Sequence, residues 1–107
     1  MTPTKQDRVD VILQCAHAIA GFYGTTAEKL LSEKAYRGQN IQNARIVFAY
    51  HLHDCGISIS SIAGMFKRSI YSTEEKIRHG RIFLMSSDRE MIETLPRVPS
   101  TLKISRA

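Results

Sequence analysis

The chain of 107 residues has only two cysteines, and no apolar run approaches the length of a membrane-spanning helix. Cys15 and Cys55 both fall in stretches with the pattern of an apolar helix face, and the first ten residues, MTPTKQDRVD, are too polar for a secretory signal. Without such a signal, we interpret the two cysteines as reduced, buried thiols rather than as a disulfide. We therefore expect a cytoplasmic protein that does not associate with a membrane.

The residue patterns that carry most catalytic chemistry are also missing. The sequence has no GxxxxGK[ST] segment for binding nucleotide phosphates, no serine or cysteine in a recognisable nucleophile setting, and no apparent pair of carboxylates where a cleft could form. The stretch HLHDC contains His51 and His53, but residues two apart point to different faces of a helix and cannot easily share a metal ion. We interpret both histidines as helix-surface or boundary residues, and we expect no enzyme, no metal and no cofactor.

Apolar residues at helical spacing are abundant, whereas alternation with period two between hairpin turns is absent. The spacing predicts helices over residues 6–23, 27–32, 41–55, about 59–66, 69–85 and 87–94. We therefore expect an all-α fold with five to six helices in one domain over residues 1–95. The following segment, residues 96–107, contains two prolines and three basic residues and is expected to be a mobile tail.

Local signals indicate where these helices begin and end. Gly56 is expected to end the third helix, and Ser58 or Ser60 is expected to begin the fourth. The fifth is expected to start near Ser69, and Gly80 either weakens its middle or permits close packing there. Capping boxes are predicted at Thr25 with Glu28, Ser72 with Glu75, and Ser87 with Glu90. The inward-facing residues predicted for the fifth helix are Ile70, Thr73, Ile77 and Leu84.

The run GISISSIAGMFKRSIYSTEEKIRHG, residues 56–80, has the layout of a helix-turn-helix, and the net charge of +5 favours an anionic partner. Larger parts of the chain resemble the C-terminal DNA-binding domain of the bacterial replication initiator DnaA, which belongs to the Trp-repressor-like helix-turn-helix group. The matching stretches are AGFYGTTAEKLLSEK with Leu30 and Lys34, NARIVFAYHL with Arg45, and SISSIAGMFKR with Phe66 and Arg68. The family run R-D-H-T-T-V appears here as RSIYST, which has Ser69 and Ile70 at the acidic and histidine positions.

The resemblance implies a protein that binds double-stranded DNA by groove docking and acts in bacterial or phage transcription or replication control. It would work either as a dimer or together with another protein. A helix-turn-helix turns the start of its second helix towards the base edges, and the exposed residues expected there are Arg68, Ser69, Tyr71, Ser72 and Glu75. The candidates for phosphate contacts are Lys34, Arg37, Lys67, Lys76 and Arg78. Each of these five is alternatively a solvated surface charge.

Two of the candidate residues have plain structural alternatives. Glu75 is either a base-reading acceptor or a complement to the helix dipole. Arg45 either reaches an adjacent groove, as the resemblance implies, or is a solvated helix residue. The altered RSIYST run and the acids Glu74 and Glu75 also favour a second hypothesis, in which a DnaA-like scaffold binds a replication or transcription protein without reading DNA. In that case the apolar run IFLM, residues 82–85, would supply the partner surface.

Overall fold

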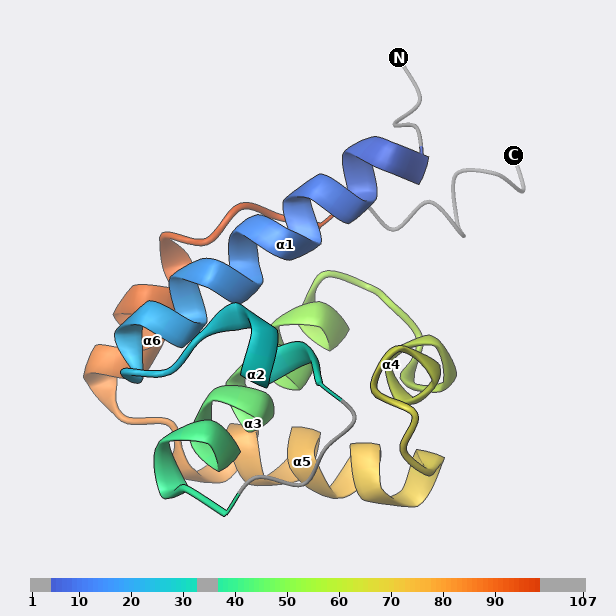
Figure 1. Cartoon of the computed structure of the whole chain (residues 1–107). Helices are drawn as coiled ribbons and strands as arrows, with labels where there is room; N and C mark the ends of the chain where they lie inside the picture. Colours follow the sequence, from blue (N-terminus) through green and yellow to red (C-terminus); the bar gives the residue numbers. More distant parts are fainter. Residues whose placement is uncertain (1–4, 33–36, 99–107) are drawn as a thin grey trace.

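A computed structural model of the chain describes residues 5–32 and 37–98, with side chains from residue 10 onward (Figure 1). The described residues form helices and no strand, which confirms the predicted all-α class. In chain order the helices are α1 (Lys5–Phe22), α2 (Ala27–Leu31), α3 (Gln39–Asp54), α4 (Ile59–Phe66), α5 (Ile70–Phe83) and α6 (Ser86–Glu93). None of these helices is both long and apolar enough to cross a lipid bilayer.

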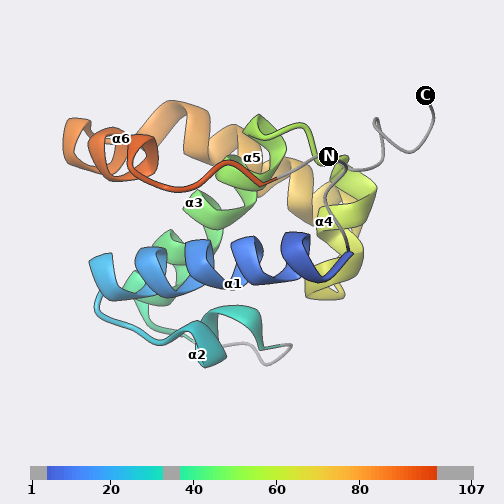
Figure 2. The same ribbon diagram turned by 90° about the horizontal axis from the view of Figure 1, so that it is seen from above.

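The centre of the molecule is α3, against which α1, α2, α4 and α5 all pack. Figures 1 and 2 show α3 lying between α1 on one side and α5 on the other. The side chains of Val47, Phe48 and Leu52 on α3 are completely buried. The ring of Phe48 meets that of Phe66 on α4 edge-on, with 5.6 Å between the centroids, which is a favourable aromatic geometry. The apolar residues of α3 therefore pack against several neighbouring helices.

Side-chain caps determine where three of the helices begin. Ser58 caps α4 and Ser69 caps α5, because each Oγ accepts a hydrogen bond from the backbone N–H three residues further on. The capping box predicted at Ser72 is wrong, because the cap lies three residues earlier and Ser72 is inside α5. Thr26 caps α2 in place of the predicted Thr25.

The start of α6 depends on an acid inside the helix. The Asp88 Oδ2 atom accepts a hydrogen bond from the Met85 N–H at 2.9 Å, so the capping box predicted from Ser87 to Glu90 is wrong. The other carboxylate oxygen of Asp88 accepts a hydrogen bond from the Tyr23 hydroxyl at 2.7 Å. Burial and the neighbouring Asp88 both raise the pKa of Tyr23 well above its ordinary value. This contact fastens α6 to the end of α1.

The chain after α6 belongs to the domain for three residues more than predicted. It runs back beside α1 in both views, and Val98 is only 2% exposed (Figures 1 and 2). The predicted boundary at residue 95 is therefore wrong, because the segment from Pro96 to Val98 packs on the core. Residues 99–107, the rest of the predicted tail, lie outside the described residues.

The buried face of α5 is shorter than predicted. Thr73 and Ile77 are buried, and Leu84 is buried just beyond the last helical residue. Ile70, predicted to face inward, is instead 51% exposed. It occupies the first helical position of α5, and the helical period alone placed it on the wrong side.

Gly80 permits close packing between α5 and α3. A Cβ atom built at Gly80 would lie only 3.1 Å from the Tyr50 Cβ on α3 and 3.3 Å from two of its ring atoms. Of the two alternatives for this glycine, close packing is therefore the one found. Gly64 in α4 offers a contrast, because a Cβ there would meet nothing within 4 Å.

Substituting these two glycines by alanine should change stability in opposite directions. Gly80→Ala should lower the free energy of unfolding by about 1–3 kcal/mol, because α5 must move away from Tyr50. Gly64→Ala should raise it by up to about 1 kcal/mol through the better helix propensity of alanine. Urea denaturation of both variants measures the two changes. A stabilised Gly80→Ala protein would contradict the packing role.

Candidate functional site

The turn between α4 and α5 places two cations immediately before α5. Lys67 follows α4 in the left-handed conformation, with φ 53° and ψ 46°, and its side chain is exposed. The next N–H, that of Arg68, donates to the Ala63 carbonyl at 2.9 Å. These backbone contacts reverse the chain tightly, so that Ser69 can begin α5 only two residues after Lys67.

Three cationic side chains from different segments meet beside the first two turns of α5. Arg45 from α3, Arg68 from the turn and Lys76 from α5 border one small cavity of about 10 Å³. The other described residues that line it are Ser32, Ala49, Phe66 and Thr73. Burial lowers the pKa of Lys76, and the nearby positive charges of Arg68 and Arg45 lower it further. Cations from separate parts of the sequence therefore gather at this end of α5.

Arg45 is neither a groove contact pointing outward nor a solvated residue. Its side chain is only 6% exposed, and its Nη2 donates to the carbonyls of Lys29 at 3.1 Å and Ser32 at 2.9 Å. Both expectations for Arg45 are therefore wrong. The guanidinium ties the end of α2 to α3, where carbonyls at a helix C-terminus need donors.

The anchoring role of Arg45 predicts a loss of stability even when its charge is kept. Arg45→Lys should lower the free energy of unfolding by about 1–3 kcal/mol, because the lysine side chain is one atom shorter and lacks the planar guanidinium that holds Nη2 between the two carbonyls. Arg37→Lys, at an exposed position, should leave it unchanged. Thermal and urea unfolding compare the two variants. Equal stability of both would contradict the anchor.

Several predicted base-contacting residues hold contacts within α5. The Ser69 Oγ accepts the cap hydrogen bond from the Ser72 N–H, and the Ser72 Oγ accepts from the Lys76 Nζ at 3.2 Å. The Arg78 Nη1 donates to the Glu75 Oε1, which forms an ion pair one turn apart. Glu75 is thus held by a neighbouring cation rather than directed alone towards solvent.

The remaining predicted site residues are placed as follows. Tyr71 is 73% exposed on the first turn of α5. Arg37 is exposed two residues before α3 begins. Lys34 lies outside the described residues. For these residues, contact with DNA stays a prediction.

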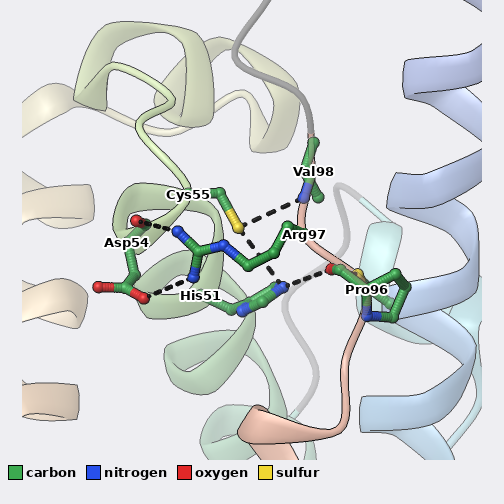
Figure 3. Close-up of polar contacts among 7 residues, drawn as sticks. His51, Asp54, Cys55, Pro96, Arg97 and Val98 are labelled. Carbon is green, nitrogen blue, oxygen red and sulfur yellow. Dashed lines mark hydrogen bonds and ion pairs between the residues drawn. The ribbon is translucent and has the colours of Figure 1, made fainter.

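A second cluster of titratable groups lies at the other end of α3, where the chain passes Pro96 (Figure 3). The Cys15 Sγ donates to the Pro96 carbonyl oxygen at 3.3 Å, and the His51 Nε2 lies 3.1 Å from the same oxygen. The Cys55 Sγ is 3.6 Å from the His51 Nε2. His51 is only 1% exposed, so the expectation that it lies on the helix surface is wrong.

The two cysteines are free thiols, Cys15 buried and Cys55 half-buried. Burial, together with the nearby Cys55, raises the pKa of Cys15 to about 11. Cys15 is therefore protonated at neutral pH and is a poor nucleophile. Among the residues that the structure describes, no group of three or more histidines, cysteines and acids is placed to hold a metal ion.

The segment after α6 is also held by charge. The Arg97 Nη1 donates to the Asp54 Oδ2 at 2.9 Å, and its Nη2 donates to the Asp54 carbonyl at the same distance. The Val98 N–H donates to the Cys55 Sγ at 3.4 Å. Figure 3 shows these contacts around His51. Together they hold the segment after α6 against the end of α3.

The buried histidine predicts that acid destabilises the protein. Burial is the main cause that lowers the pKa of His51 below its ordinary value of 6.5, and Arg97 lowers it further, against opposing effects of the Pro96 carbonyl and Asp54. As the pH falls through 6.5, the unfolded chain therefore binds a proton before the folded chain does. The free energy of unfolding should therefore decrease as the pH falls below about 6.5, and His51 should contribute a slope of up to about 1.4 kcal/mol per pH unit.

Urea denaturation between about pH 7 and about pH 5 measures this dependence. His51→Gln should remove the part of the slope that belongs to this residue. His79→Gln, which changes an exposed histidine, should keep the slope. An identical slope in all three proteins would show that His51 is not responsible.

Comparison of the chain with protein-family models, with curated protein sequences and with solved structures gives no match. The functional interpretation of the candidate site therefore depends on the geometry of this chain alone, namely on three cations that gather beside the exposed first turn of α5.

Proposed function

We propose that this protein binds double-stranded DNA, with α4 and α5 acting as a helix-turn-helix. The observation that supports this most directly is the gathering of Arg45, Arg68 and Lys76 beside the start of α5. Phosphate contacts by Lys and Arg supply most of the affinity of DNA-binding proteins, and the net charge of +5 agrees with an anionic partner. The resemblance to the DNA-binding domain of DnaA favours the same function.

In the proposed complex the first turn of α5 faces the base edges of the major groove. Lys67 and Arg68 directly precede that turn, and Tyr71 is exposed on it. Lys67 and Lys76 would contact phosphates on either side, and Arg68 would reach either a phosphate or a guanine. The protein would act in bacterial or phage transcription or replication control by occupying a selected site, as a dimer or with another protein.

A second candidate function is binding to a replication or transcription protein without reading DNA. It is favoured by exposed apolar side chains at the far end of α5, where Ile82 is 76% and Met85 is 68% exposed. Beside them, an open groove between α3 and α5 is lined in part by Ile46 and Phe83. A pull-down that recovers one protein partner in stoichiometric amount, together with absence of DNA binding, would favour this alternative.

Titration of a fluorescent mixed-sequence duplex at several salt concentrations tests the DNA-binding function. The logarithm of the affinity should fall linearly with the logarithm of salt concentration between about 50 mM and about 200 mM, because bound cations release counterions from the DNA. Arg68→Ala and Lys76→Ala should each weaken binding and reduce the slope by about one. Arg68→Ala should also relax sequence preference if it reads a base.

Arg89→Ala provides the matched control. It removes the same charge as Arg68→Ala, but from α6, which Figure 1 shows at the opposite end of α5 from its first turn. Its affinity and slope should equal those of the unchanged protein. Titrations that show no binding at low salt would reject the proposed function, and equal losses in all variants would reject the proposed interface.

A further inference from the structure

Four polar side chains at the start of α5 already have partners inside the helix. The hydroxyl of Ser69 caps the helix, and that of Ser72 accepts from Lys76. The Thr73 Oγ1 donates to the Ser69 carbonyl at 3.0 Å and is buried. Further along, Glu75 is paired with Arg78. These four side chains are thus used in contacts within the helix itself.

The first turn nevertheless has a prominent exposed surface, formed by one aliphatic and one aromatic side chain. Ile70 is 51% exposed and Tyr71 is 73% exposed, at adjacent positions directly after the Ser69 cap. Ile70 is β-branched, so its rotamer on a helix is strongly restricted and its methyl groups are fixed in direction. An isoleucine side chain has no donor or acceptor, so it can recognise only another apolar group of matching shape.

On the proposed DNA partner, one apolar group lies at the base edges of the major groove, namely the C5-methyl group of thymine. We infer that Ile70, assisted by the Tyr71 ring, selects thymine in the target site by contact with this methyl group. The inference depends on the proposed DNA-binding function and assigns its sequence selectivity to apolar contact. Cations from the turn and from α5 then hold the duplex, and Ile70 distinguishes thymine from the other bases.

Uracil differs from thymine only in lacking the C5-methyl group, and it keeps the same base pairing. The test therefore begins by selecting bound sequences from duplexes with a randomised segment. The selected duplex is then synthesised with uracil in place of each thymine in turn, and its affinity is measured. At one or more positions the unchanged protein should bind the uracil duplex about fourfold more weakly, the effect of one buried methyl group.

Ile70→Ala should bind the thymine duplex more weakly and should bind the thymine and uracil duplexes equally. Ile82→Ala is the matched control, because it shortens an exposed isoleucine on the same helix three turns away. This control should keep the full preference for thymine. Circular dichroism of both variants verifies that they are folded.

The outcomes separate this inference from the proposed function. Salt-dependent binding without any effect of uracil, or with an effect that persists in Ile70→Ala, would overturn the role of Ile70 and leave DNA binding in place. Failure of the unchanged protein to bind any duplex would overturn both. A thymine preference that Ile70→Ala removes and Ile82→Ala keeps would support both.

Discussion

The enclosed position of α3 determines how its polar residues are used. With α1, α2, α4 and α5 all packed around this helix, Arg45 and His51 are buried, and a buried polar group without a hydrogen bond is destabilising. One nitrogen of each side chain, the Arg45 Nη2 and the His51 Nε2, meets this requirement at backbone carbonyls of another segment, whereas the His51 Nδ1 is buried without a hydrogen bond among the described residues. Arg45 holds the end of α2, whereas His51 holds the segment at Pro96. Two polar residues of α3 thereby join this helix to two other parts of the chain.

The same constraint produces the electrostatic character of the candidate site. Because Arg45 is held by two carbonyls, its charge has a fixed position beside the start of α5. Arg68 and Lys76 then share its surroundings, which disfavours protonation of Lys76. The proposed interface thus combines a cation required by the fold with cations supplied by the turn and by α5.

The fold class and the approximate helix starts were predictable from the sequence, whereas the capping contacts and the features that depend on neighbouring helices were not. The all-α class follows from the apolar period, and α4 and α5 begin next to the predicted Ser58 and Ser69, but all three predicted capping boxes are wrong because several neighbouring residues could cap each helix. Ile70 matched the period of α5 but is exposed, because the period alone does not show which residues of a helix its neighbours cover. Arg45 and His51 are polar residues in a helix that has several other polar residues, so only the surrounding segments show that these two are buried.

Lys67 gives the pair α4 and α5 a fixed mutual orientation. A left-handed backbone at a residue with a side chain costs about 1–2 kcal/mol, so packing of both helices on α3 must maintain the turn. In the proposed DNA complex, a turn that is already formed in this way would reduce the conformational entropy lost on association, so more of the contact energy would be available as affinity.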